Sequence, residues 1–407
     1  MRCNISNKDL FIVHQEKFSS NGIPYPVASP YPGPQKIEPT AEVISNQSSL
    51  CVFDEKNFSQ DSEEVAVNDT DYKLSNSRVF LAADFVLENI QWVPSGKQLL
   101  ISYTTLDRVG RETIAIVDVS SASILIKGDR QFNYAAPIWF DNQQSIAYTD
   151  PIEGGNYNIF ITHSLEENTP VVIAQTSQPN FSKGPEESLI LFSQTEKKRI
   201  EIIDTKGSIQ STLNMANPEW DFGPSLPQPG RFAWNNTTNS LAINSPNGLF
   251  FFDIKSGKIC QLDLGEQSEE KLWPYYASWS PNNRYLAMLT TSGTGILPFM
   301  NLTILDYLTG KLIPVIPENS LSTGNFFFTD ITWSPDSKTI ATLFGRGDNI
   351  GNQLLFVDVT TGNSKQVLPE TNFYSGGISG NLAWSPDGAH IAYICPKGPL
   401  CIGDINR

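Results

Sequence analysis

Short runs of alternating apolar and polar residues recur along this chain from about residue 78 to its end, and turn residues separate them. In the clearest unit the apolar runs cover residues 330–333, 339–343, 353–358 and 365–368. Between the first two runs, Pro335 fixes φ at the second position of a turn, and Asp336 suits the third position. This pattern predicts four short antiparallel strands per unit and an all-β fold.

The unit occurs seven times, and each copy has an aromatic residue at the end of its first strand. The copies are about 49 residues apart on average, which is a spacing typical of propeller blades. The aromatic residues are Trp92, Trp139, Phe181, Trp234, Trp279, Trp333 and Trp384. We therefore predict a seven-bladed β-propeller of four-stranded antiparallel blades over residues 77–407, in which the six tryptophans are structural core residues.

The seventh unit ends soon after its third strand, because only residues 405–407 follow Asp404. Residues 78–81 have the pattern of a strand and lie 11 residues before Trp92, where the fourth strand of a preceding blade would lie. An unpaired edge strand is a liability for a β-protein. We therefore predict that this N-terminal strand pairs with the seventh blade and closes the ring.

Residues 1–76 differ in kind from the repeats. Six prolines lie between Pro24 and Pro39, and an acidic stretch follows from Asp54 to Asp71. This composition predicts an extended Pro-rich tail and an acidic, mostly irregular linker. Residues 50–54 resemble a third strand, so the alternative that part of the linker lies along the propeller stays open.

The charge balance restricts the partners of the chain. It has 28 Lys and Arg residues against 43 Asp and Glu residues, a net charge of −15. Such a surface repels phosphate backbones and anionic lipid, so we expect no nucleic-acid partner. The apolar runs are much shorter than the roughly 20 residues that span a bilayer, so we expect no transmembrane segment. A closed ring predicts a monomer.

The N-terminal sequence gives two alternatives for the compartment. The first 20 residues lack the apolar core and cleavage site of a secretory signal. The chain as given is therefore expected in the cytoplasm. If the recorded start is late, Cys3 could carry a lipid anchor, and the protein would then lie in the periplasm or on the cell surface.

The five cysteines show no CxxC spacing, so we expect no metal site built on them. Cys395 and Cys401 flank residues 396–400, where a hairpin would place them opposite each other. A cross-strand disulfide would form there in an oxidising compartment, and two buried thiols are the alternative.

Groups for catalysis are sparse. The three histidines, His14, His163 and His390, are far apart in the sequence, so we predict no catalytic residue, no metal and no cofactor. An aspartate ends the third strand in six units and starts a turn whose amides it can bind, which is the role that we predict for it. These aspartates are Asp118, Asp204, Asp253, Asp306, Asp358 and Asp404.

The last repeat resembles a known family. Trp384-Ser385-Pro386-Asp387-Gly388, followed by residues 390–393 and 400–404, resembles the TolB-type WD40-like repeat of the PD40 family. The resemblance covers roughly residues 78–407. It implies a propeller of six or seven blades, mostly bacterial, often in the cell envelope, that binds other proteins. TolB itself has an N-terminal α/β domain, where this chain has the Pro-rich tail.

Aromatic residues recur just before the predicted inner strands, in loops that would open on one face of the ring. Aromatic side chains beside polar loops are enriched at binding surfaces, although wedging between blades is the alternative. The candidate binding residues are Trp273, Tyr275, Tyr276, Phe326, Phe327 and Tyr374. We predict a non-catalytic scaffold that binds a protein or glycan partner. A hydrolase or lyase with a pocket at the ring axis, and a structural role in a surface assembly, are the alternatives.

Overall fold

The computed structural model describes the part of the chain that forms the repeats. The described residues are 49–51, 72–81, 85–105, 110–131, 136–140, 144–153, 155–163, 170–176, 181–193, 199–214, 232–245, 248–254, 258–262, 273–292, 299–315, 326–346, 349–367, 382–395 and 399–406. The chain divides into two compact units, residues 1–40 and 41–407, and every described residue belongs to the second. Most of the tail and linker predicted for residues 1–76 therefore lies outside the described residues.

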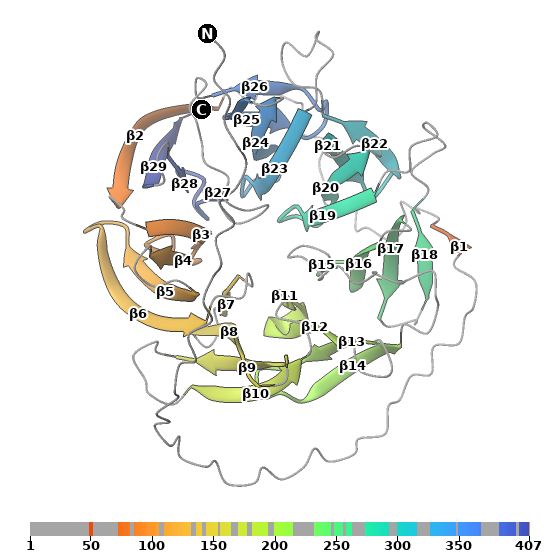
Figure 1. Ribbon diagram of the computed structural model, residues 1–407. Coiled ribbons are helices and arrows are strands. Elements are labelled where there is room, and N and C mark those ends of the chain that lie inside the picture. The colour runs from red at the N-terminus through yellow and green to blue at the C-terminus, as the bar shows by residue number, and fades with distance from the viewer. Residues whose placement is uncertain are drawn as a thin grey trace, which may run out of the picture. The chain divides into compact units, whose positions relative to one another are not determined.

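Seven four-stranded antiparallel blades surround a common axis in this unit, as the repeats predicted (Figure 1). The first three blades follow the chain from the innermost strand outward. They are β3 (Phe85–Trp92), β4 (Gln98–Thr105), β5 (Arg111–Asp118) and β6 (Ser123–Gln131); β7 (Ile138–Phe140), β8 (Ser145–Pro151), β9 (Tyr157–Thr162) and β10 (Val171–Thr176); and β11 (Phe181–Lys183), β12 (Leu189–Ser193), β13 (Arg199–Ile203) and β14 (Ile209–Asn214).

The next three blades continue in the same order. They are β15 (Phe232–Asn235), β16 (Ser240–Ser245), β17 (Gly248–Asp253) and β18 (Ile259–Gln261); β19 (Trp273–Trp279), β20 (Tyr285–Ser292), β21 (Phe299–Asp306) and β22 (Lys311–Pro314); and β23 (Phe326–Trp333), β24 (Thr339–Arg346), β25 (Asn349–Asp358) and β26 (Ser364–Gln366). Blades five and six also touch through one parallel bridge, Met300 to Phe327. The helical content described is a single short 3-10 turn, Pro185–Glu187.

The seventh blade joins the two ends of the described chain. It consists of β27 (Leu382–Trp384), β28 (His390–Ile394), β29 (Leu400–Asn406) and β2 (Lys73–Leu81). β2 pairs antiparallel with β29, from Lys73 opposite Asn406 to Leu81 opposite Leu400. This pairing confirms the predicted closure of the ring by an N-terminal strand.

The hydrophobic core of the propeller lies between its blades. Among the described residues, seven clusters of buried side chains each span two neighbouring blades. The second strands contribute alanines that are almost completely buried, such as Ala147, Ala287 and Ala392. A small side chain on a strand that is covered on both faces lets adjacent blades approach closely. The repeat is therefore a unit of packing that is completed only by its neighbour.

The Ser-Pro-Asp signature forms a turn that is held by hydrogen bonds of its own serine hydroxyl. The Ser334 hydroxyl donates a hydrogen bond to Asp336 (2.7 Å) and accepts one from the amide of Thr339 (3.0 Å). The residue after the aspartate adopts a left-handed conformation, with φ of 62° at Ser337 and 75° at Gly388. Glycine adopts this conformation without strain, which explains its place in the last copy of the signature.

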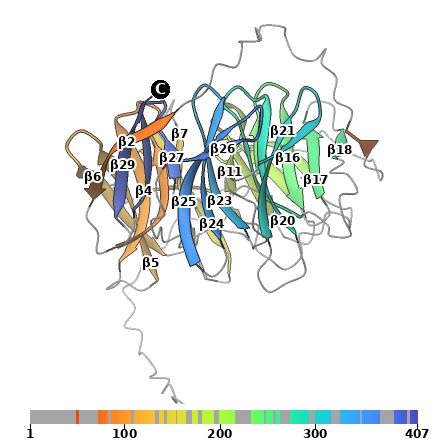
Figure 2. The same ribbon diagram turned by 90° about the horizontal axis from the view of Figure 1, so that it is seen from above.

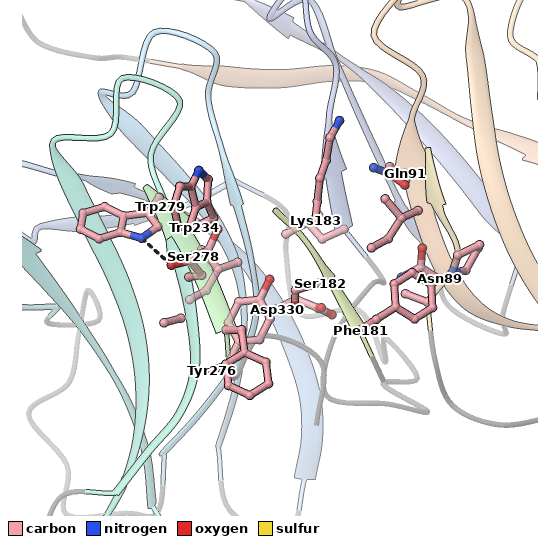
Figure 3. Close-up of a pocket in the computed structure, with 18 of the residues that line it drawn as sticks. Asn89, Gln91, Phe181, Ser182, Lys183, Trp234, Tyr276, Ser278, Trp279 and Asp330 are labelled. Atoms are coloured by element: carbon pink, nitrogen blue, oxygen red, sulfur yellow. Dashed lines mark hydrogen bonds between the residues drawn. The ribbon is translucent and has the colours of Figure 1, made fainter. Parts of the chain in front are cut away.

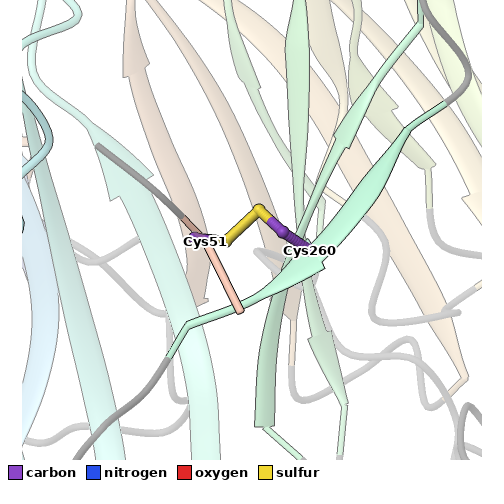
Figure 4. Close-up of a disulfide and its surroundings, with 2 residues drawn as sticks. All are labelled: Cys51 and Cys260. Atoms are coloured by element: carbon purple, nitrogen blue, oxygen red, sulfur yellow. A yellow bond between two sulfur atoms is a disulfide. The ribbon is translucent and has the colours of Figure 1, made fainter. Parts of the chain in front are cut away.

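A short strand from the N-terminal linker lies at the rim of the fourth blade. β1 (Ser49–Leu50) pairs in parallel with β18, and the next amide, of Cys51, donates to the carbonyl of Gln261 (3.0 Å). A disulfide joins Cys51 to Cys260, with their Cα atoms 4.9 Å apart (Figure 4). Seen across the ring, β1 lies at the edge beside β18 (Figure 2). At residues 49–51, therefore, the linker does lie along the propeller.

A second disulfide joins Cys395 to Cys401 across the hairpin between β28 and β29, with a Cα separation of 5.7 Å. Of the two alternatives left open by the sequence, the structure contains the cross-strand disulfide and not two thiols. The hairpin places β28 and β29 in antiparallel register, with Ile394 opposite Leu400. This register brings the two cysteines within disulfide range.

Candidate functional site

The inner strands enclose a cavity of about 410 Å³ at the axis of the ring. Residues on or next to the innermost strand of every blade line it. Figure 3 shows Trp234, Tyr276, Ser278 and Asp330 on one side, and Asn89 and Gln91 on the other. A cavity of this size is within the range of small-molecule sites in proteins. The ring therefore presents a concave site to which all seven repeats contribute.

Two bulges, besides one in β3 next to Asn89, shape the wall of this cavity. The register of β19 shifts between Pro274 and Tyr276, and that of β23 shifts between Thr329 and Ile331. Bulges bend a strand and change the direction of its side chains. The second one contains Asp330, whose backbone is left-handed (φ 51°) and whose side chain is only 3% exposed. A carboxylate is thus held in the wall of the cavity.

Tyr276 contributes a phenol beside this carboxylate. Burial raises its pKa to about 12, the nearby charge of Asp330 adds to the increase, and a hydrogen bond with Ser278 opposes it. The phenol therefore keeps its proton near neutral pH and acts as a hydrogen-bond donor or acceptor. Tyr276 also packs against the hydrophobic cluster between the fifth and sixth blades.

Lys183 is the basic residue of the described lining. It follows Ser182 at the end of β11, and its Nζ atom donates to the carbonyl of Trp139 at 3.4 Å. The same Nζ lies 5.8 Å from the centre of the Phe140 ring, within cation-π range. The lining therefore contains one cation and one carboxylate among aromatic and small polar side chains.

The tryptophans that mark the repeats are mostly buried, and three of them bridge blades. The indole Nε1 donates to a backbone carbonyl of the preceding blade from Trp92 to Ala383 (2.9 Å), from Trp279 to Ala233 (3.0 Å) and from Trp333 to Ser278 (3.2 Å). Trp139 and Trp384 are also buried, and Trp384 donates to the carbonyl of Gly388 in its own turn.

Trp234 departs from this pattern. It is half-buried in the wall of the axial cavity. Its Nε1 atom is inaccessible to solvent and has no hydrogen-bond acceptor among the described residues. A buried donor without an acceptor is destabilising, so such groups often mark a site for a ligand or an ordered water.

The sequence placed the candidate binding aromatics in loops before the inner strands, and this placement is wrong for most of them. Trp273 and Tyr275 lie within β19, and Phe326 and Phe327 lie within β23. Aromatic residues favour extended strands, and both strands begin earlier than the apolar pattern indicated. The side chains of these four residues, and all of Tyr374, lie outside the described residues. Tyr276 lies in the cavity wall.

The sequence did not identify the cavity residues Lys183, Trp234 and Asp330 as a site. The residues come from three different blades, so no local motif connects them. The bulge that places Asp330 leaves no signal in the apolar pattern. Only the recurrence of inner strands could have indicated that their middle residues meet at the axis.

The aspartates at the ends of the third strands act as turn residues where the structure describes their bonds. Asp358 accepts hydrogen bonds from the hydroxyl (2.7 Å) and amide (3.0 Å) of Thr360 and from the amide of Thr361 (2.9 Å). Burial raises the pKa of Asp358, and these bonds outweigh burial and lower it. Within the described ranges, no group of three or more His, Cys, Asp or Glu residues could hold a metal ion. Likewise, no helix in the described part of the chain has the length and apolar character needed to cross a bilayer.

Comparisons with solved structures place the fold. A chain of a mitotic checkpoint complex superposes with a TM-score of 0.53 at 15% identity, covering 86% of this chain and 98% of that one. Hydrazine synthase of Kuenenia stuttgartiensis superposes with a TM-score of 0.52 at 12% identity, covering 79% of this chain and 96% of that one. These superpositions agree with the seven blades described above, and together they show a seven-bladed β-propeller fold.

Sequence comparison finds a relative for only part of the chain. One of the subunits of eukaryotic translation initiation factor 3, from Dictyostelium discoideum, is 27% identical over 158 residues, which are 38% of this chain and 20% of that protein. The match thus spans only a fifth of the length of this relative. No family model matches the chain.

Proposed function

We propose that the protein is a non-catalytic scaffold that binds a protein partner through one end of its ring. This end, the aromatic face, is where β19 and β23 begin, with Trp273, Tyr275, Phe326 and Phe327. The proposal depends mainly on one observation: two neighbouring inner strands both start with aromatic residues at the same end of the ring. Aromatic residues dominate the energetics of protein interfaces. A glycan, which also stacks on aromatic rings, is the alternative partner.

The comparisons support a role in protein assemblies. One similar propeller belongs to a mitotic checkpoint complex, and the partial sequence relative is part of a translation initiation factor with several subunits. The TolB-type PD40 resemblance of the Trp-Ser-Pro-Asp repeats implies protein binding too. We propose this subtype for the chain because the turn held by its serine hydroxyl recurs with the same hydrogen bonds at Ser280, Ser334 and Ser385.

The axial cavity supports binding better than catalysis. A hydrolase or lyase would need an acid and a base whose pKa values lie near the working pH. The pKa of Tyr276 is raised to about 12 instead, which keeps this phenol from exchanging its proton near neutrality. Asp330 is buried in the wall and lies close to Tyr276 (Figure 3). These features are those of a recognition pocket.

The two disulfides bear on the compartment. Structural disulfides persist in oxidising surroundings and are rare in the cytosol. The Cys51–Cys260 and Cys395–Cys401 pairs therefore support the second alternative of the sequence, a periplasmic or surface location. We include this location in the proposal.

The aromatic face is tested by substitution and partner capture. Tyr275→Ala and Phe326→Ala should each weaken capture of co-purifying proteins about 30-fold, since an interface anchor contributes 2 kcal/mol or more. Lys338→Ala is the control, because Lys338 is an exposed residue in a turn at the other end of the ring. Capture that is unchanged in both aromatic variants, or that is lost only with Lys338→Ala, would refute the proposal.

A further inference from the structure

We infer that the axial cavity binds the cationic group of a basic amino acid, either as the amino acid itself or as a side chain of a partner protein. The inference concerns the cavity and its described lining. It does not depend on the aromatic face, so either proposal can fail without the other.

Asp330 gives one part of the cavity wall a negative charge that attracts a cation. Asp330 is the one carboxylate among the described lining residues, and it is only 3% exposed. A carboxylate in such a low-dielectric position creates a strong negative potential in the space beside it. The left-handed backbone and the bulge hold it there at a cost in strain, and strained conformations of this kind concentrate at functional sites. The net charge of −15 adds a long-range attraction for cations.

Aromatic groups complete the site for a cation. Trp234 and Tyr276 line the cavity on the same side as Asp330 (Figure 3). Aromatic faces stabilise ammonium and guanidinium groups, and tryptophan does so most strongly. Because the phenol of Tyr276 stays protonated, Tyr276 offers a cation its neutral aromatic ring and a hydroxyl group.

The indole of Trp234 indicates that the ligand also carries a hydrogen-bond acceptor. Its buried Nε1 donor has no acceptor in the described structure, whereas Trp92, Trp279 and Trp333 each donate to a backbone carbonyl. Trp234 lines the cavity, so a rotation of its indole on ligand binding would bring this donor to a ligand oxygen. A cation with a carbonyl or carboxylate oxygen a few bonds away is the chemistry of a basic amino acid or of a basic residue in a peptide.

Lys183 distinguishes the two sources of this chemistry. Its ammonium group belongs to the described lining, with its Nζ close to the carbonyl of Trp139. A single amino acid carries an α-carboxylate that this cation would attract, whereas a residue within a peptide carries none. Replacing Lys183 should therefore weaken binding of the amino acid and leave binding of the peptide unit unchanged.

The test is calorimetric titration of the full chain with defined probes. These are arginine, Nα-acetylarginine amide, Nα-acetyllysine amide and Nα-acetylcitrulline amide, the last of which has the shape of the arginine probe without its charge. We expect at least one basic probe to bind. The acetylcitrulline amide should bind at least about tenfold more weakly than the acetylarginine amide, because a hydrogen bond to a charged group contributes about 1.5 kcal/mol or more.

Three variants locate the binding. Asp330→Asn should weaken the basic probes about tenfold or more, and asparagine tolerates the left-handed backbone at this position. Trp234→Phe keeps an aromatic ring but removes the donor, so it should weaken binding severalfold. Glu153→Gln removes one negative charge from an exposed residue outside the cavity and should change nothing.

Arginine that binds the wild type more tightly than acetylarginine amide, with this advantage lost in Lys183→Met, identifies the amino acid as the ligand. Acetylarginine amide that binds at least as tightly as arginine identifies a partner side chain. The inference is overturned if no basic probe binds, if citrulline amide binds as tightly as arginine amide, or if a folded Asp330→Asn protein binds as the wild type does. If Asp330→Asn does not fold, the citrulline comparison and Trp234→Phe decide the question.

Discussion

At the scale of single residues, the tryptophans of the repeat connect one blade to the next. Trp92, Trp279 and Trp333 are buried, and each donates its indole proton to a backbone carbonyl of the preceding blade. The indole ring of each tryptophan thus packs between two sheets, and the hydrogen bond from its Nε1 atom fixes the distance between those sheets. The bond from Trp92 to Ala383 makes the same connection between the first and last blades.

Trp333→Ala should lower the free energy of unfolding by about 3 to 5 kcal/mol, because it removes a large buried ring and leaves a cavity between two blades. Trp333→Phe is the matched comparison. It keeps most of the ring and loses the bond to the Ser278 carbonyl, so it should cost less, and about 1 kcal/mol of its cost should come from that bond. Urea unfolding measures both variants. An alanine variant as stable as the wild type would show that this tryptophan is not a core residue.

At the scale of strands, sequence patterns succeeded where a local signal exists. The strand that closes the ring was predictable because its apolar pattern and its spacing from Trp92 leave no other blade for it. The early starts of β19 and β23 were not predictable, because consecutive aromatic residues are compatible with both a strand and a binding loop. The apolar run at residues 50–54 left open that the linker lies along the propeller. No local pattern indicated where it pairs, because β1 and β18 pair over only two residues and Cys51 and Cys260 are 209 residues apart.

Removal of β2 should destabilise the whole ring. Deleting residues 1–81 removes β2 and exposes the edge of β29, whereas deleting residues 1–71 removes β1 and the Cys51 disulfide but leaves β2 paired. The difference between the two truncations therefore isolates β2 together with the buried Tyr72 that precedes it. Both proteins lose the Cys51–Cys260 disulfide, so we expect the longer deletion to melt at a markedly lower temperature than the shorter one, or to aggregate through the open edge. Equal melting temperatures for the two proteins would contradict a role of β2 in closure.

At the scale of the whole molecule, the site exists only because the ring closes. Each blade contributes one to four residues to the lining of the axial cavity, and no blade forms a pocket by itself. The fold could therefore be predicted from the repeats, whereas the chemistry of the axis could not. Which inner-strand residues meet there depends on the bulges of β19 and β23 and on how all seven blades are rotated about the axis.

The two disulfides should contribute unequally to the stability of the molecule. Cys51 and Cys260 are 209 residues apart and Cys395 and Cys401 only 6, so the first crosslink removes far more freedom from the unfolded chain. In the chain-entropy model the two contributions are about 5 and about 2 kcal/mol. The Cys51→Ser, Cys260→Ser protein should therefore unfold at a lower urea concentration than the Cys395→Ser, Cys401→Ser protein. Full reduction of the wild type and both variants should remove most of the difference, and an equal or larger loss from the short-loop pair would refute this ranking.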